Sequence, residues 1–164
     1  MVCHAEKYKT PNTFRRNCAT IRTVMLQKPY EVFDHTADIG LHAYGRTLSE
    51  LFIHAAQGME SLMVAPEQIQ VQVSREIIVE GHDAVSLLVT WLNELIFLFD
   101  TEYLLFRDFE IDAITETHLK GRASGEPYDS QRHDLSSAIK AVTWHEAAVT
   151  LSDDGYKARI IFDI

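Results

Sequence analysis

The alternation of apolar and polar residues predicts strands at both ends of the chain. Residues 30–35 and 39–45 alternate on either side of a short acidic segment, a period of two that is typical of a half-buried strand. The same period over residues 156–164 predicts a strand at the end of the printed sequence. The other segments expected to be extended are 69–80, 103–113, 117–123, 138–145 and 147–151.

Two segments have the helical period instead. Thr47 and Glu50 have the spacing of a capping box, so we expect a helix to begin directly after Thr47. Its apolar residues recur every three or four positions up to Met63 and form one stripe, which leaves Gln57 and Glu60 on the opposite, solvent-facing side. A second helix is predicted after Asp83, and it is so densely apolar that it must be largely buried.

The order of these elements indicates the fold class. Two strands, a helix, a strand, a second helix and then several strands lack the regular alternation of a doubly wound parallel sheet. We therefore expect an α+β fold, a two-layer sandwich of mostly antiparallel sheet and two main helices. The polar residues 124–137, which include Gly125 and Pro127, are predicted to form a flexible loop.

Composition and charge narrow the function classes. A chain of 164 residues fits one compact domain, and no apolar run approaches the ~18 residues of a membrane span, so no membrane partner is expected. The formal net charge of −9 is unevenly distributed, because the basic residues gather near the start. The acidic body would repel a phosphate backbone, so we expect no direct nucleic-acid binding by it.

Residues 1–29 are predicted to be a basic, flexible N-terminal extension that precedes a domain formed by residues 30–164. The extension lacks the apolar core of a secretory signal, although an organelle transit peptide stays open as an alternative. Both cysteines, Cys3 and Cys18, lie in it, which supports neither a zinc site nor a disulfide framework. A cytoplasmic location is expected.

Three oxygen-bearing groups are the candidate site. Asp38 lies in the acidic segment, and Asp163 and the terminal carboxylate of Ile164 end the last predicted strand. If the fold brings them together, their charges favour a hard cation such as Ca²⁺ or Mg²⁺ over zinc, since no thiolate accompanies them. The alternative is that Asp38 caps a turn and Asp163 is a solvated strand end.

Histidines and a lysine allow other interpretations. His35, Asp38 and Asp163 could form the metal centre of a phosphohydrolase, but the sequence has no zinc-protease spacing and no glycine-rich phosphate loop. We expect most of the eight histidines to be surface or locally hydrogen-bonded residues. Lys140 and His145 fall on opposite faces of a regular strand, so a joint catalytic role for them is not expected.

Five segments, in this order, resemble the archease family over nearly all of residues 30–164. They are Asp34-His35-Thr36-Ala37-Asp38-Ile39-Gly40, Trp91-Leu92-Asn93-Glu94-Leu95, Gly125-Glu126-Pro127-Tyr128-Asp129 followed by Arg132-His133, Lys140-Ala141-Val142-Thr143-Trp144-His145, and Asp163-Ile164. The resemblance implies a protein without a reaction of its own that activates an RtcB-type RNA ligase. Such a protein promotes ligase guanylylation and multiple turnover in tRNA splicing and RNA repair.

The resemblance also implies a metal site and a topology. The site is of the calcium type, with Mg²⁺ or Mn²⁺ as alternatives, and maps onto Asp38, Asp163 and Ile164. The fold is one strand-helix-strand-strand unit inserted in another. Two features depart from the family pattern: residues 1–29 have no counterpart, and Trp144 stands where a tyrosine is more usual, which keeps an aromatic surface but changes its hydrogen-bonding group.

Overall fold

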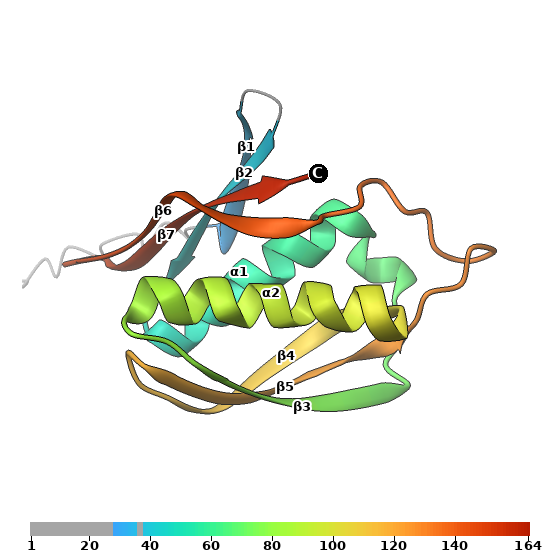
Figure 1. The fold of residues 1–164 in the computed structure, drawn as a ribbon, viewed down its shortest axis with the longest axis horizontal. Helices are drawn as coiled ribbons and strands as arrows, with labels where there is room; N and C mark the ends of the chain where they lie inside the picture. The colour runs from blue at the N-terminus through green and yellow to red at the C-terminus, as the bar shows by residue number, and fades with distance from the viewer. Residues whose placement is uncertain (1–27, 36–37) are drawn as a thin grey trace, which may run out of the picture.

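A computed structural model describes residues 28–35 and 38–164, and these form two antiparallel sheets and two long helices (Figure 1). The prediction of an α+β fold is confirmed. The predicted extension lies, up to residue 27, outside the described residues, and so do residues 36 and 37 of the acidic segment.

Each sheet contains strands from distant parts of the chain. The first has the order β1-β2-β7-β6, and the second has the order β3-β5-β4. The strands of the first sheet are β1 (Tyr30–His35), β2 (Asp38–Gly45), β6 (Ala141–Ser152) and β7 (Gly155–Asp163). Those of the second are β3 (Val73–Glu80), β4 (Leu104–Ile114) and β5 (His118–Pro127). The helices are α1 (Leu48–Met63), α2 (Ala84–Glu102) and the short 3-10 helix η1 (Pro66–Gln68).

The two helices lie between the two sheets (Figure 1). Helix α1 contacts β2 of the first sheet and β4 of the second, and α2 contacts β6 and β3. The unit β3-α2-β4-β5 is inserted between α1 and β6, so the expected insertion of one strand-helix-strand-strand unit in another is present. Each unit pairs a helix with a sheet, and the two units meet through their helical sides.

This arrangement explains why one helical residue does not face solvent. Glu60 was expected opposite the apolar stripe of α1, but it is only 2% exposed. The stripe packs against the first sheet, while β4 of the second sheet covers the other side of the helix. A helix between two sheets therefore buries polar positions that a one-sided pattern places in water.

Both helices begin where the sequence predicts. The Thr47 hydroxyl accepts a hydrogen bond from the Glu50 amide at 3.2 Å, and the Glu50 carboxylate accepts one from the Arg46 amide at 2.8 Å. Asp83 and Ser86 form a reciprocal capping box at the start of α2. These bonds satisfy amide groups that have no partner within the helix.

Helix α2 has the length and composition of a membrane span, but half of its residues in that window are buried within the fold. Trp91 is fully buried, and its indole N–H donates to the Phe52 carbonyl of α1 at 3.3 Å. The apolar character of α2 is therefore explained by its position in the core between the sheets.

Strand boundaries differ from the prediction in three places. Residues 69–72 are not part of β3, because backbone and side-chain groups there bond to Gly125 and Glu126. Residues 124–127, expected in a loop, continue β5, where Gly125 pairs with Phe106 of β4. The two runs 138–145 and 147–151 merge into the single strand β6, which begins only at Ala141, so residues 138–140 precede it, and its register shifts between Thr143 and Ala148.

Gly125 is required where β5 crosses close to β4. A Cβ atom at this position would lie 1.9 Å from the Leu105 carbonyl oxygen. We expect Gly125→Ala to lower the free energy of unfolding by about 1–3 kcal/mol, the usual cost of overpacking, measured by urea denaturation. Ser124→Ala, one residue earlier and partly exposed, is the control and should change it by less than about 1 kcal/mol. Equal midpoints for the two variants would contradict this account.

Candidate functional site

Strand β7 lies between β2 and β6 and brings the two aspartates of the predicted site to one end of the sheet. Ile39 of β2 pairs with Phe162 of β7 in antiparallel register. Asp38 precedes Ile39 and Asp163 follows Phe162, so the continuation of this register places the two aspartates across from each other. They lie where the β1–β2 hairpin and the end of the printed sequence meet.

The last two residues are held by their backbones. The Lys140 amide donates to the Asp163 carbonyl at 2.9 Å, and the Lys140 ammonium donates to the Ile164 backbone oxygen at 3.0 Å. Asp163 remains exposed, and Ile164 is 40% exposed. The fold thus fixes the main chain at this end while the Asp163 carboxylate stays accessible.

The donor types at this end suit a hard cation. Among the side chains of the described residues, no three His, Cys, Asp or Glu gather as a group that could hold a metal ion. Ile164 would add a main-chain oxygen beside Asp38 and Asp163, and such an all-oxygen set matches Ca²⁺ or Mg²⁺. The Lys140 ammonium already lies against Ile164, so a bound cation would share this end with it or displace it. Metal binding at these residues stays a prediction.

A stack of side chains on the outer face of the first sheet holds the β1–β2 hairpin against β7. A Cβ atom at Gly40 would lie 2.1 Å from the Phe33 ring, so the ring occupies the space that the glycine leaves. The Phe33 ring stacks on His42 with centroids 4.6 Å apart, and the Arg159 guanidinium lies 4.6 Å from the Phe33 ring. Glu146 of β6 pairs with Arg159. This stack supports the strand that carries Asp38.

His42 belongs to this stack as a neutral ring. Burial lowers the pKa of the His42 imidazole, and the charges of Lys157 and Arg159 lower it further. Its buried Nδ1 atom makes no hydrogen bond to the described part of the chain. Both observations assign His42 to packing.

The register shift in β6 changes how Lys140 relates to His145. Lys140 precedes the strand, whereas Trp144 and His145 lie in the irregular stretch between Thr143 and Ala148. Glu146, in the same stretch, has a positive φ of 54°. Trp144 is 63% exposed as a result. The face assignment made for a regular strand therefore does not apply beyond Thr143.

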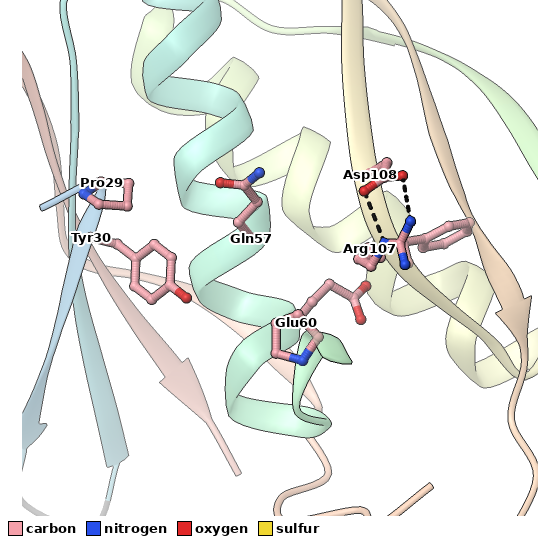
Figure 2. Close-up of a pocket in the computed structure, with 8 residues that line it drawn as sticks. Pro29, Tyr30, Gln57, Glu60, Arg107 and Asp108 are labelled. Carbon is pink, nitrogen blue, oxygen red and sulfur yellow. Dashed lines mark hydrogen bonds and ion pairs between the residues drawn. The ribbon is translucent and has the colours of Figure 1, made fainter. Parts of the chain in front are cut away.

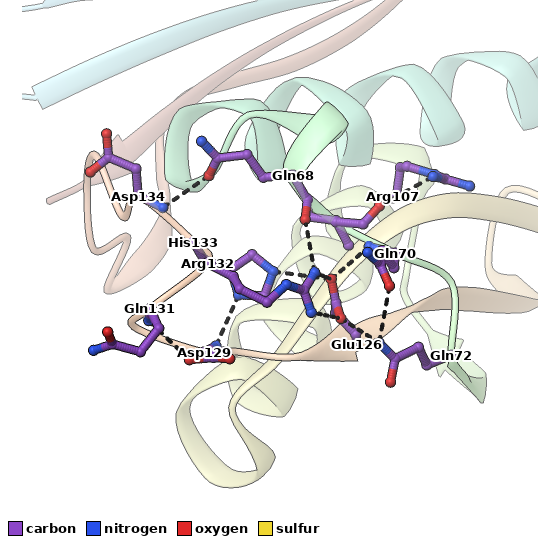
Figure 3. A network of polar contacts seen from close by, with 11 residues as sticks. Gln68, Gln70, Gln72, Arg107, Glu126, Asp129, Gln131, Arg132, His133 and Asp134 are labelled. Atoms are coloured by element: carbon purple, nitrogen blue, oxygen red, sulfur yellow. Dashed lines mark hydrogen bonds and ion pairs between the residues drawn. The ribbon is translucent and has the colours of Figure 1, made fainter.

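A buried carboxylate anchors the segment that leads to Lys140 (Figure 3). Glu126 is 1% exposed and accepts hydrogen bonds from the Arg132 guanidinium at 2.7 and 2.8 Å, the Gln70 amide at 2.6 Å and the Gln72 side chain at 2.7 Å. The Arg132 guanidinium first, and then the Gln70 amide and the His133 ring, lower the pKa of Glu126 to about 2. A carboxylate with this many partners is stable in the interior only as the ionised form.

His133 completes the network. Its Nδ1 accepts from the Asp129 amide at 2.9 Å, so Nε2 carries the hydrogen of the neutral ring and donates to Glu126 at 3.1 Å. The Tyr128 amide donates to the Tyr103 carbonyl at 2.7 Å. These contacts tie the chain after β5 to the second sheet.

Asn93 fixes the start of β6 from the helix layer. Its side-chain oxygen accepts from the Val142 amide at 3.0 Å. Asn93 and the Glu126 network thus position both sides of Lys140, yet residue patterns alone assigned neither a role. Polar residues could have indicated the Glu126 network in the sequence. An Arg-His pair begins six residues after Glu126, and glutamines alternate at positions 68, 70 and 72.

This geometry belongs to a known family. The sequence model of the Archease protein family matches residues 30–164, and the chain belongs to that family. The protein archease of Methanosarcina barkeri is 40% identical over 141 residues, which cover 84% of this chain and 97% of the relative. That of Sulfolobus acidocaldarius is 38% identical over 136 residues, which cover 82% of this chain and 98% of the relative.

Solved structures support the same assignment. The solution structure of Methanobacterium thermoautotrophicum protein 1598 is 38% identical, with a TM-score of 0.72, and the match covers 84% of this chain and 100% of that one. A Thermotoga maritima crystal structure, described as an archease and possible chaperone, is 19% identical with a TM-score of 0.54 over 82% of this chain and 96% of that one. The second similarity concerns the fold alone.

The pKa of Glu126 predicts how stability depends on pH. Because this pKa falls from 4.5 to about 2 in the folded chain, the ionised carboxylate stabilises the fold above about pH 4.5, and the contribution is lost as the pH falls toward 2. We expect Glu126→Gln to lower the urea midpoint at pH 7 and to flatten its decline between pH 5 and pH 3. Glu110→Gln, which alters a surface pair with Arg122, is the control. Parallel acid declines for wild type and Glu126→Gln would refute this role.

Proposed function

We propose that this chain is a non-catalytic activator of an RtcB-type RNA ligase that promotes ligase guanylylation and multiple turnover in tRNA splicing and RNA repair. Membership of the archease family supports this proposal. The observation that carries it is the register of β2 and β7, in which Ile39 pairs with Phe162, so that the neighbouring Asp38 and Asp163 fall at the same end of the sheet. The name possible chaperone, given to the T. maritima protein, also describes assistance to another protein.

The role of these residues follows from charge and position. Asp38, Asp163 and the Ile164 carboxylate would hold a divalent ion, most simply Ca²⁺, with Mg²⁺ and Mn²⁺ as alternatives. Such an ion, when bound, supplies charge neutralisation beside a triphosphate. The protein's own contribution is orientation: hydrogen bonds from the Lys140 amide and the Lys140 ammonium fix the strand end, so Asp163 and Ile164 would meet the ligase's nucleotide site from a fixed position.

The net charge supports a protein partner over a nucleic acid. With a net charge of −9, the protein would not compete with the ligase for RNA, so it would act on the ligase itself, in the cytoplasm. No observation on the described part of the chain favours the phosphohydrolase alternative. We therefore do not propose a reaction catalysed by His35, Asp38 and Asp163.

Asp38→Ala tests the proposal directly. The variant should remain folded, because Asp38 lies at a strand end, but should stimulate ligase guanylylation at least about tenfold less than wild type per folded molecule, as expected for a lost metal ligand. The assay measures covalent GMP transfer to purified ligase. Asp154→Ala, at the opposite end of β7 in the β6–β7 turn, is the control and should activate normally. Full stimulation by Asp38→Ala would end this proposal.

An extension after Ile164 tests the terminal carboxylate separately. A peptide bond there removes the charge that the proposed site uses, so two added glycines should impair guanylylation as Asp38→Ala does. Adding the same two glycines before Met1 is the control. If the ion serves only to stabilise the fold, a chelator would lower the melting temperature while activation per folded molecule stays unchanged.

A further inference from the structure

A cavity of about 310 Å³ lies between α1, β4 and the start of β1 (Figure 2). It is at the opposite end of the β1–β2 hairpin from Asp38, because Tyr30 pairs with Ala43 and His35 pairs with Asp38. Its volume is at the lower limit of small-molecule sites, which span roughly 300–1,000 Å³. Its apolar walls are Pro29, Tyr30, Pro66 and Phe106.

Glu60 lines this cavity with an unsatisfied group. The residue is 2% exposed, and its Oε2 atom has no hydrogen-bond partner in the described part of the chain. A backbone hydrogen bond from Phe106 reaches the carboxyl group. A buried carboxyl oxygen without a partner is costly, which makes Glu60 the natural recognition group of the cavity.

Arg107 lines the same cavity but does not neutralise Glu60. Its Nε and Nη2 atoms donate to the two carboxylate oxygens of Asp108, each at 3.1 Å, as the dashed lines of Figure 2 show. Its Nη1 atom donates to the Ile69 carbonyl at 3.1 Å. The Arg107–Asp108 pair is therefore satisfied and neutral as a unit, and Glu60 is left as the acid without a counter-charge.

We propose that this cavity binds a small organic cation, a primary alkylammonium whose N–H groups pair with Glu60 and whose alkyl stem lies between the apolar walls. An ammonium carries three donors, one of which the unpaired Glu60 oxygen can accept, and Gln57 adds a polar side chain to the lining. The Tyr30 ring adds a face that favours a cation. A bare metal ion fits less well, because Ca²⁺ needs six or more oxygen ligands and the cavity has one unpaired carboxyl group.

This recognition is coupled to pH. Burial raises the pKa of Glu60 to about 8, and the other titratable groups that line the cavity are Tyr30 from β1 and Arg107 and Asp108 from β4, while η1 contributes only Pro66. An alkylammonium stays charged up to about pH 10. Binding below pH 8 therefore releases a proton from Glu60, and affinity should rise with pH by at most about tenfold per unit until pH 8.

Calorimetric titration of the full chain with butane-1,4-diamine tests this assignment. We expect saturable binding that tightens from pH 6.5 to pH 8. At pH 7, the heat should differ between two buffers of unlike ionisation enthalpy by the release of about one proton. Butane-1,4-diol, the neutral analogue, should bind at least about tenfold more weakly. Absence of saturable heat, an affinity independent of pH and buffer, or equal binding of the diol would each overturn the proposal.

A matched pair of variants locates the binding. Glu60→Gln keeps the shape of the side chain and removes its charge, so diamine affinity should fall at least about tenfold. Glu67→Gln removes the same formal charge from an exposed position outside the cavity lining and should bind as wild type does. Unchanged affinity in Glu60→Gln, or equal losses in both variants, would refute the site. If Glu60→Gln fails to fold, the proton release measured with the wild-type chain still tests whether Glu60 binds the diamine.

Discussion

The structure depends on the pairing of β7 with β2 on one side and β6 on the other. Ile39 pairs with Phe162 and Ala141 pairs with Asp163, so this strand joins the N-terminal hairpin to the C-terminal one across most of the described chain. Contacts this distant in sequence close a long loop, at an entropic cost that grows slowly with its length. The inserted β3-α2-β4-β5 unit shortens the effective distance, because it folds back and places Asn93 against the first residues of β6.

Two buried glutamates show how partners decide the state of a carboxyl group. Glu126 and Glu60 are 1% and 2% exposed, so burial alone would raise the pKa of both. Arg132, with Gln70 and His133, reverses this for Glu126 and lowers its pKa to about 2, whereas within the described part of the chain a backbone hydrogen bond from Phe106 does not offset burial for Glu60, and its pKa rises to about 8. The first holds a segment of chain in place. The second is neutral at pH 7 and able to change its state when a cation arrives.

Local patterns were sufficient for the helices and for most strands. Thr47 and Asp83 cap the helices because their side chains bond amides within three residues, and such short-range chemistry is visible in the sequence. The division into two sheets was not visible in the sequence. Alternation indicates which face of a strand is buried, but it does not indicate which element covers that face. The burial of Glu60 follows from that division, and the irregular stretch around Trp144 follows from pairing with β7. The sequence pattern therefore does not predict which strand or helix packs against which, because that is a property of the tertiary structure.

The candidate site could likewise be predicted only in part from the sequence. That Asp163 ends a strand could be predicted from alternation, but its position across from Asp38 requires knowing that β2 and β7 are neighbours, which rested on family resemblance. The structure supplies the reason for that neighbourhood. Gly40 leaves room for the Phe33 ring, the ring contacts His42 and Arg159, and Arg159 pairs with Glu146 of β6. One missing side chain thus allows a cross-strand stack that spans all four strands of the first sheet. A larger residue at position 40 would displace the Phe33 ring and so loosen the hairpin that carries Asp38.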